Sequence, residues 1–533
     1  MPFERRQTSF QAASSLYSKR QPETHLIHNA HPNTMPTLPS LLAPAHAAYQ
    51  TALRRPQHTQ AQILRTILRS NQHSQFGQQH HFAHIRSPED YAQRVPIQSY
   101  DTLAPSIARH AGGEANILTS SPVIQFEETG GSTAGAKLIP YTAPLLTAFQ
   151  HGIHAWFADL IAHRPRAFSG SLYFIISPAA RRHSHTAGGI PIGTGNDLNY
   201  LGSALAQRIA PQILHQPQLA QAQSPADWQI RTATLLAQSP SLSLISAWSP
   251  TLLLNIVHTL HQQQDTILRH IPDAHRRRTL AQALAPAIPR TQQIWTQLDT
   301  ISCWDSHTAA APAAQLRQLF PHAHLQGKGL LATEGITTLP FSGCLLPALT
   351  SHYYEFADEH GQIRPLHQLQ HGNRYRLLLT TQGGLYRYDT QDWLLAQPSP
   401  YANIPSLHFI GRSSLNSDLV GEKLTETFAA QAIRQALAPF SGCFFLQGST
   451  TPQPHYILWH DPAFKPSDHA LAALNTALCA NPQYHYAQQI GQLGNLTAHP
   501  HPQLLAYASQ HARSRVLGTQ KIPLLLPPIA KAA

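Results

Sequence analysis

The chain has 533 residues, and a hydrophobic content of 42% gives it enough apolar material for several domains with buried cores. Its formal charge of +11 is dispersed, and the densest basic cluster is "HRRR" at residues 275–278, which disfavours a nucleic-acid partner because such proteins need a clustered basic face. Four scattered cysteines exclude a disulfide framework and a CxxC zinc site, and no apolar run approaches the ~18 residues of a membrane span. We therefore expect a cytoplasmic protein without a membrane partner, and a monomer.

Residues 1–34 are expected to be a disordered extension. They lack the apolar core of a signal peptide, and no hydrophobic stretch follows the pair Arg5 and Arg6 as a twin-arginine signal would require. The folded pattern begins just after Met35. Histidine is abundant along the whole chain, including "HHFAH" at residues 80–84, but no acidic residue or cysteine completes a ligand set there, so we interpret these residues as surface histidines.

The next elements alternate between helix and strand. Apolar residues at helical spacing predict helix over residues 36–68, after which "VPIQSYDTL" is predicted to be extended. Residues 122–126 predict a short strand, followed by a Gly/Ser/Thr-rich loop. An amphipathic helix is expected after Thr142, a good N-cap, and residues 171–177 predict a buried strand. The order strand, glycine-rich loop, helix, strand is typical of α/β folds.

The second half is predicted to be helical over residues 203–300 and then rich in strands. "YRLLLTTQGGLYRY" has "QGG" between two alternating runs and predicts a hairpin. After Arg412 the elements become short: helices near residues 425–437 and 468–478, and a hairpin from "CFFLQG" and "HYILWH". We therefore predict an α/β fold with a large domain of mixed sheets and helices at residues 35–412 and a small α+β domain at residues 413–533.

The loop in "ETGGSTAGAKLIPYT" almost matches a Walker P-loop. Gly130 and Gly135 have the right spacing, but Ala136 stands where the lysine belongs, Lys137 comes one place late, and Leu138 replaces the magnesium-binding Ser or Thr. Small residues and hydroxyls in such a loop still allow backbone N–H groups to approach phosphate closely. A flexible turn explains the loop equally well when it is taken alone.

Later stretches carry further polar residues, each of which also has a purely structural interpretation. "LLATEGITTLPF" places Thr333 and Glu334 at the end of an apolar run, as a strand-end acid would lie. "GLYRYDTQDWL" sets Arg387 and Asp392 beside aromatics, where a cross-strand ion pair is an alternative. "HFIGRSSLNSDLVGEKLTE" and "GTQKIPLL" have the patterns of a solvated turn and of a surface lysine.

In this order, the stretches resemble the Gretchen Hagen (auxin-responsive promoter) family of acyl-acid amido synthetases, in its bacterial branch, within the adenylate-forming enzymes. The resemblance extends over about residues 36–525. It is carried by "ETGGSTAGAK", "GKGLLATEG", "TTQGGLYRYDTQD" and "FIGRSSLNSDLVGEKLTE", and "NPQYHYA" is similar to the C-terminal region of the family. The opening loop is then the phosphate loop of this family, with its lysine in the expected place.

The resemblance implies ATP and Mg²⁺ as cofactors and assigns roles by position. The residues that would surround the β- and γ-phosphates are Thr129, Gly130, Gly131, Ser132, Thr133 and Gly135, with Lys137 as a catalytic cation. Glu334, with Thr333, would ligate magnesium, Asp392 would hold the ribose hydroxyls, and Arg412 would contact ribose or phosphate. Lys521 would move to the reacting carboxylate and the α-phosphate.

Some positions depart from the family pattern. Gln391 stands where glycine is usual, and Asp389 and Thr390 alter the preceding pair. Leu524 replaces an arginine, which weakens the assignment of Lys521. The implied reaction activates a carboxylic acid as acyl-AMP and transfers the acyl group to the amine of an amino acid. Two alternatives stay open: an acyl-CoA ligase of the phenylacetate type, and a non-catalytic basic binding protein. The acyl pocket is expected within residues 145–260, around "GGIPIGTGNDLNYLG".

Overall fold

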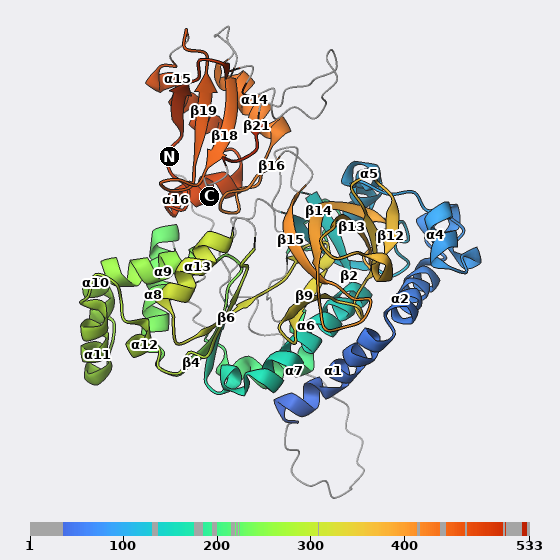
Figure 1. Cartoon of the computed structure of the whole chain (residues 1–533), viewed down its shortest axis with the longest axis horizontal. Coiled ribbons are helices and arrows are strands. Elements are labelled where there is room, and N and C mark those ends of the chain that lie inside the picture. The colour runs from blue at the N-terminus through green and yellow to red at the C-terminus, as the bar shows by residue number, and fades with distance from the viewer. Residues whose placement is uncertain are drawn as a thin grey trace, which may run out of the picture. The chain divides into compact units, whose positions relative to one another are not determined.

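The structure, a computed structural model, describes residues 36–533 apart from several short segments (Figure 1). These segments are residues 130–136, 175–184, 194–199, 215–218, 220–221, 223, 307–308, 413–415, 438–443, 464–465, 505–506, 508–524 and 530–533. Among the described residues, no helix is both long and apolar enough to cross a bilayer.

The chain begins with helices, as the spacing predicts. α1 (Leu38–Arg54) and α2 (Pro56–Asn71) are separated at Arg55, where proline begins the next helix. The prediction of extended structure over "VPIQSYDTL" is partly wrong, because "YDTL" opens α5 (Tyr100–Ala111). Ser99 caps this helix in a reciprocal capping box with Thr102, a start signal that the β-rich appearance of the stretch obscured. Two short helices, α3 (Gln75–Gln79) and α4 (Pro88–Arg94), lie between α2 and α5.

The predicted order of strand, loop, helix and strand lacks one element. β1 (Val123–Thr129) is followed across the glycine-rich segment by a second strand, β2 (Lys137–Thr142), and the two pair antiparallel. Only then does α6 (Ala143–His163) begin, with Thr142 as its N-cap. Ile139 and Tyr141 are buried on β2, and burial of alternate side chains explains why this stretch is a strand. The loop therefore closes a hairpin instead of leading into a helix.

A four-stranded parallel sheet follows, in the order β3-β4-β5-β6. Its strands are β3 (Ser171–Phe174), β4 (Leu242–Ser246), β5 (Thr300–Cys303) and β6 (His324–Gly327). One face packs in the same core as α6, through Leu172 and Leu244. The other face, with Ile245 and Ile301, belongs to a second core. β4 lies inside the region predicted to be helical, so that prediction is wrong there.

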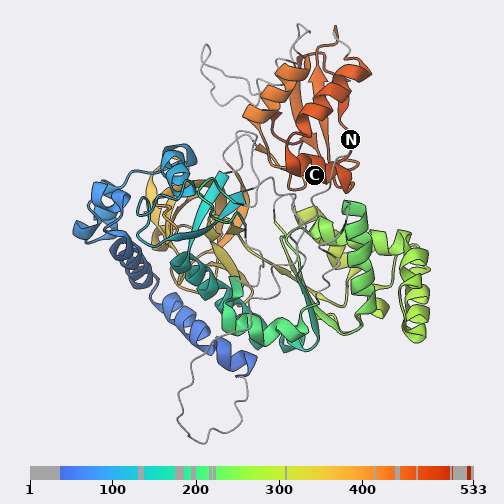
Figure 2. The same ribbon diagram turned by 180° about the vertical axis from the view of Figure 1, so that it is seen from behind.

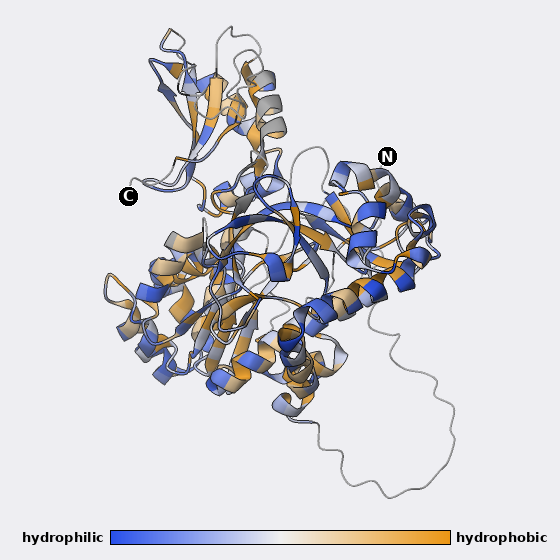
Figure 3. Cartoon of the chain, turned by 45° about the vertical axis from the view of Figure 1, so that its right-hand side comes forward, coloured by the Kyte–Doolittle hydropathy of each residue, from blue (hydrophilic) through white to orange (hydrophobic). Residues whose placement is uncertain are grey.

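Helices surround this sheet. They are α7 (Ser203–Ile209), α8 (Pro225–Gln238), α9 (Pro250–Gln262), α10 (Gln264–Arg269), α11 (Ala274–Leu284), α12 (Thr291–Ile294) and α13 (Ala310–Leu319). α8 to α13 gather beyond one side of the sheet in both opposed views (Figures 1 and 2). Hydrophilic and hydrophobic residues alternate along the helices of the chain, as expected for helices that each bury one face (Figure 3).

A five-stranded antiparallel sheet contains the predicted "QGG" hairpin. Its order is β12-β11-β13-β14-β15. Its strands are β11 (Tyr353–Ala357), β12 (Ile363–Pro365), β13 (Arg374–Thr380), β14 (Tyr388–Gln397) and β15 (Ser406–Arg412). The short hairpin of β7 (Leu331–Ala332) and β8 (Gly335–Ile336) precedes it, as does the pair β9 (Thr338–Phe341) and β10 (Cys344–Pro347).

The last part of the chain is a smaller α+β domain with a hydrophobic core of its own. Its sheet has the order β20-β19-β18-β21, and the predicted hairpin is confirmed as β18 (Phe444–Ser449) with β19 (His455–His460). The remaining strands are β20 (Thr497–Pro500) and β21 (Leu525–Leu526), beside the short pair β16 (Asn416–Ser417) and β17 (Leu424–Thr425). Its helices are α14 (Glu426–Leu437), α15 (Asp468–Leu478) and α16 (Pro482–Gln489). The domain boundaries at residues 34 and 412 stay predictions.

Candidate functional site

The base of the β1–β2 hairpin places Lys137 at the edge of the glycine-rich segment. Thr129 and Lys137 are cross-strand partners and flank residues 130–136. The Lys137 ammonium lies 5.1 Å from the centroid of the Tyr100 ring, whose hydroxyl accepts the backbone N–H of Leu138 at 2.9 Å. The first residue of α5 thus fixes both the backbone and the cation at this end of the hairpin.

Some predicted loop residues cannot be placed. Gly130, Gly131, Ser132, Thr133 and Gly135 lie outside the described residues, and so does the side chain of Thr129. Their assignment as a phosphate loop therefore stays a prediction.

Thr333 and Glu334 form the two-residue turn between β7 and β8, where Ala332 pairs with Gly335. The Tyr141 hydroxyl donates a hydrogen bond of 2.6 Å to the Thr333 carbonyl and so joins this turn to the β1–β2 hairpin. Glu334 is only 5% exposed, and within the described part of the chain its carboxylate has no hydrogen-bond donor or cation. Burial raises the pKa of Tyr141, and the negative charge of Glu334 adds to the rise.

A buried histidine holds the turn in place. His352 Nε2 accepts the backbone N–H of Ile336 at 3.2 Å, and burial lowers the pKa of His352 to about 3, so the ring is neutral and able to accept. A Cβ added to Gly335 would lie 2.9 Å from this ring and 2.9 Å from the Leu379 side chain. Glycine is required here because the turn packs directly on His352, the residue before β11, and on Leu379 of β13.

Asp392 lies at an irregularity of β14. The register of β13 with β14 shifts between Arg376 and Leu378, and Gln391 takes a left-handed φ of 64°. The Thr390 hydroxyl donates to the Leu377 carbonyl and accepts the backbone N–H of Asp392, both at 3.1 Å. Such bulges change the direction of a side chain, and Asp392 is buried at 1% exposure.

The Glu334 turn and the Asp392 bulge lie along the same stretch of β13. Gly335 packs on Leu379, and Thr390 bonds to Leu377, two residues away on the strand. Two residues of a strand span ~7 Å, so the structure brings these parts of the predicted site together. The Thr142 hydroxyl also donates to the Gln382 carbonyl at 3.0 Å, which attaches the end of the hairpin to the loop between β13 and β14.

Two predicted contacts stay untested. The backbone of Arg412 is the cross-strand partner of Asp392, but its side chain is outside the described residues, as is the whole of Lys521. Arg387, by contrast, forms a buried ion pair of 3.0 Å, and its partner is Glu355 of β11, not Asp392.

The sequence interpretation missed Tyr141 and His352. Both lie in apolar stretches with the pattern of ordinary core, and only the tertiary contacts show that they hold the Glu334 turn. Tyr141 also contacts Phe149 of α6, at 5.8 Å between ring centroids, and Tyr200 at 6.1 Å. The described residues of the segment around "GGIPIGTGNDLNYLG" therefore lie beside the hairpin.

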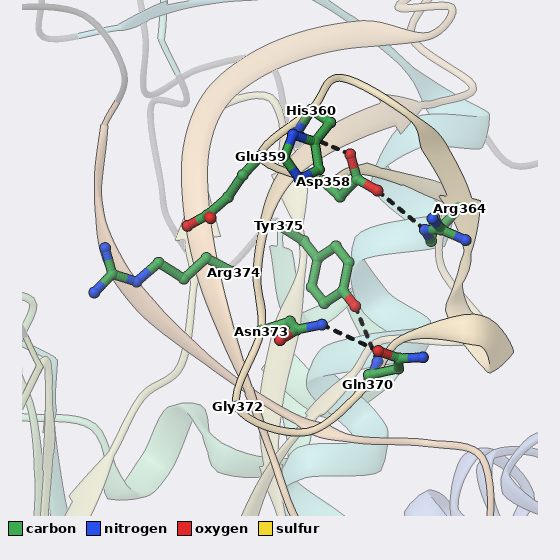
Figure 4. A pocket seen from close by; sticks show the side chains of 9 residues that line it. All are labelled: Asp358, Glu359, His360, Arg364, Gln370, Gly372, Asn373, Arg374 and Tyr375. Atoms are coloured by element: carbon green, nitrogen blue, oxygen red, sulfur yellow. Dashed lines mark hydrogen bonds and ion pairs between the residues drawn. The ribbon is translucent and has the colours of Figure 1, made fainter.

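A separate pocket of about 380 Å³ lies at the ends of β11, β12 and β13 and contains none of the predicted site residues (Figure 4). Its polar groups bond to one another: Asp358 pairs with Arg364 at 3.1 Å, and the Tyr375 hydroxyl accepts the Gln370 N–H at 3.0 Å. We therefore do not regard it as the reaction site.

The model of the GH3 family N-terminal domain matches residues 45–325, and that of the GH3 family central domain matches residues 345–412. A probable indole-3-acetic acid-amido synthetase GH3.2 of Oryza sativa subsp. japonica is 29% identical over 135 residues, which are 25% of this chain and 22% of that protein. The indole-3-acetic acid-amido synthetase GH3.2 of Arabidopsis thaliana is 27% identical over 141 residues, 26% of this chain and 25% of that protein. The chain thus matches only about a quarter of the length of these relatives.

Solved structures match almost the whole fold. A GH3.15 acyl acid amido synthetase superposes with a TM-score of 0.62 at 15% identity, covering 93% of this chain and 95% of that one. A 2-hydroxyisobutyryl-CoA ligase superposes with a TM-score of 0.53 at 13% identity, covering 89% and 90%. At such identities these matches show a shared fold and nothing more. Since the N-terminal and central family models together cover well over half of its residues, the chain belongs to the GH3 family.

Proposed function

We propose that the protein is an ATP-dependent ligase that activates a carboxylic acid as acyl-AMP and transfers the acyl group to an amine, that of an amino acid. The observation that carries this proposal is that the Glu334 turn and the Asp392 bulge lie along the same stretch of β13, and that the turn is bonded to Tyr141 of β2, the strand that begins at Lys137. Membership of the GH3 family supports the amide-forming outcome.

The chemistry requires these residue types. A carboxylate is a poor acyl donor because oxide is a poor leaving group. When a carboxylate oxygen attacks the α-phosphorus of ATP, an acyl–AMP bond forms and pyrophosphate leaves with the electron pair of the broken P–O bond. Negative charge accumulates in this transition state, and Lys137 beside the loop would offset part of it.

Glu334 fits a magnesium ligand. Mg²⁺ at nucleotide sites typically takes one or two protein carboxylates together with substrate phosphates. A buried carboxylate without a cation among the described residues suits that role. Bound magnesium would supply charge neutralisation at the phosphates, while Tyr141 and His352 keep the turn that carries Glu334 in position.

Asp392 would accept hydrogen bonds from the ribose hydroxyls. Its backbone is fixed by Thr390 and by the bulge. The Asp392 side chain would therefore lose little conformational entropy when the ribose binds. Arg412 on the neighbouring strand and Lys521 complete the proposal as contacts to ribose or phosphate and to the reacting carboxylate.

Hydroxylamine trapping tests this function. Purified protein, magnesium-ATP and a panel of carboxylic acids are incubated with hydroxylamine, and hydroxamate and pyrophosphate are followed. We expect at least one acid to yield both products in equal amounts. Replacing hydroxylamine by amino acids or by coenzyme A then identifies the acceptor, and a thioester as sole product would contradict amide formation. No product from any acid, with no binding of ATP, would contradict the proposal as a whole.

A further inference from the structure

A row of polar side chains crosses the parallel sheet at the carboxyl ends of its strands. Ser246, Ser302 and Gln326 are register partners on β4, β5 and β6, so their side chains lie on one face. This is the face toward α6, because Trp156 of α6 donates its indole N–H to Gln326 Oε1 at 2.8 Å. The carboxyl edge of a parallel sheet is where α/β proteins commonly bind ligands.

A buried lysine stands over this row. Lys328 directly follows β6 and is 3% exposed. Its ammonium donates to Ser246 Oγ at 2.7 Å and to the Ser302 carbonyl at 3.1 Å, and it lies 5.4 Å from the ring centroids of both Trp156 and Trp248. Within the described part of the chain, no carboxylate lies within ion-pair distance of it. All of its contacts are therefore to neutral groups.

The surroundings of this ammonium are incomplete in two ways. The hydroxyl of Ser302 is buried and has no hydrogen-bond partner among the described residues. Trp248, although it covers the ammonium, has 39% of its surface exposed, and its ring lies 5.6 Å from that of Trp304. An unpaired hydroxyl and a third ammonium N–H, next to the exposed indole of Trp248, are the groups that a ligand oxygen would use.

A structural role alone explains this arrangement poorly. A lysine that only tied β4 to β5 would bury a charge without an anion, which is costly, and an apolar side chain of similar volume would be more stable. Burial lowers the pKa of Lys328 to about 7, as expected for an ammonium without a counter-ion. Buried ionisable groups of this kind are commonly functional.

The distance between Lys328 and the proposed reaction site determines the length of a ligand that could reach both. Trp156 lies seven residues beyond Phe149 on α6, and Phe149 stacks on Tyr141, the residue bonded to the Glu334 turn. Seven helical residues span ~10 Å. A group held by Lys328 would therefore be about this far from the reaction site.

We propose that Lys328 determines acyl specificity by binding a second carboxylate, at the end of the acyl acid remote from the carboxylate that is activated. The proposal rests on the proposed function, since it assigns a substrate class, the dicarboxylic acids, to that site. The second carboxylate supplies the counter-ion that Lys328 lacks and an acceptor for the Ser302 hydroxyl, while the indoles of Trp156 and Trp248 contact the carbon chain.

Binding of matched acids, measured without ATP, tests this inference directly. The probes are 4-carboxyphenylacetate against 4-methylphenylacetate, and suberate against octanoate, followed by tryptophan fluorescence and by calorimetry. We expect the dicarboxylate of each pair to bind at least tenfold more tightly to the wild type, because a hydrogen-bonded buried charge pair contributes about tenfold to a hundredfold. Lys328→Met should reduce the ratio to less than twofold, and Lys328→Arg should retain part of it.

Ser246→Ala is the matched control, since it removes the bond that would tie the strands but keeps the ammonium. It should retain most of the preference. Equal affinities within each pair for the wild type, no binding of either dicarboxylate, or the same ratio in Lys328→Met as in the wild type would overturn the inference. Because ATP is absent, the result is independent of catalysis: failure of the proposed function would appear only as missing hydroxamate with acids that do bind.

Discussion

Glu334 combines burial with the absence of a positive partner in the described residues, and it occupies a turn fixed from two sides by Tyr141 and His352. A carboxylate in such a place is available as a ligand for a cation. The three side chains form a unit in which two buried groups position a third.

Glu334→Gln is predicted to lower acyl-adenylate formation by about 10²–10³ while leaving the fold intact, because the amide keeps the shape but loses the charge that we propose binds magnesium. Pyrophosphate release with a trapped acid measures the effect. Glu359→Gln, the same change at an exposed position of the pocket in Figure 4, is the control and should keep full activity. Equal turnover of the two variants would refute the assignment of Glu334.

His352 makes the fold sensitive to acid. Its pKa is about 3 in the folded protein and ~6.5 in an unfolded chain, so below pH 6.5 the unfolded chain binds a proton that the folded one does not. The free energy of unfolding therefore decreases as the pH falls from 6.5 towards 3. At pH 5 the decrease caused by His352 is about 2 kcal/mol.

The variant His352→Gln tests this, since the amide oxygen can still accept the Ile336 N–H but does not titrate. Urea denaturation at pH 7 and pH 5 should show a loss about 2 kcal/mol smaller in the variant than in the wild type. The same loss in both proteins would show that the ring does not stay neutral in the fold.

Gln391 occupies a left-handed conformation that costs most side chains on the order of 1 kcal/mol and costs glycine little. The backbone here takes a glycine-like conformation, which agrees with the glycine that is usual in the family pattern, and nothing in the structure explains the glutamine of this chain. Gln391→Gly should raise the unfolding free energy by about 0.5–1 kcal/mol, whereas Gln397→Gly, on the same strand, should lower it. Destabilisation by Gln391→Gly would show that the side chain stabilises the bulge.

At the scale of elements, Thr142 joins β2, α6 and the loop between β13 and β14. Its hydroxyl accepts the Leu145 N–H at 3.2 Å as the cap of α6 and donates to the Gln382 carbonyl at 3.0 Å. The residue is fully buried. One side chain thus fixes the hairpin of Lys137 relative to the strand of Asp392.

Thr142→Val is predicted to cost about 2–3 kcal/mol of stability, since a cap and a buried hydrogen bond are lost together. Thr147→Val is the matched control: it lies on the exposed side of the same helix, and its hydroxyl bonds only to the Ala143 carbonyl one turn earlier. Thermal or urea denaturation compares the two variants. A loss of equal size in both would mean that the junction contributes nothing specific.

The elements also show what the sequence could predict. α6, α14, α15 and both hairpins follow from periodicity, caps and turn residues. β4 and β5 do not, because strands of a parallel sheet are buried on both faces and show no alternation, so "LSLIS" and "TISC" resemble pieces of buried helix. β2 was not predicted: the sequence placed a helix after Thr142, but "KLIPYT" before it is too short and too close to a proline to show a clear strand pattern.

At the scale of the whole molecule, the two-domain architecture and the stretches that contain Glu334 and Asp392 were predictable, because each is visible in a contiguous run of residues. The side chains that hold the Glu334 turn in place were not predictable. Tyr141 and His352 act over separations of about 192 and 16 residues, and neither belongs to a recognisable motif. Lys328 was within a quoted motif, but only the register of three strands shows the polar row beneath it.

The central claim is that a carboxylate oxygen attacks the α-phosphorus of ATP. The most direct test uses an acid substrate labelled with ¹⁸O in its carboxylate, magnesium-ATP and the amine acceptor, with mass spectrometry of the nucleotide product. The account predicts AMP that carries one ¹⁸O atom, together with unlabelled pyrophosphate and an amide that retains the other labelled oxygen. Label in inorganic phosphate alongside ADP, or amide formed without label in AMP, would contradict it.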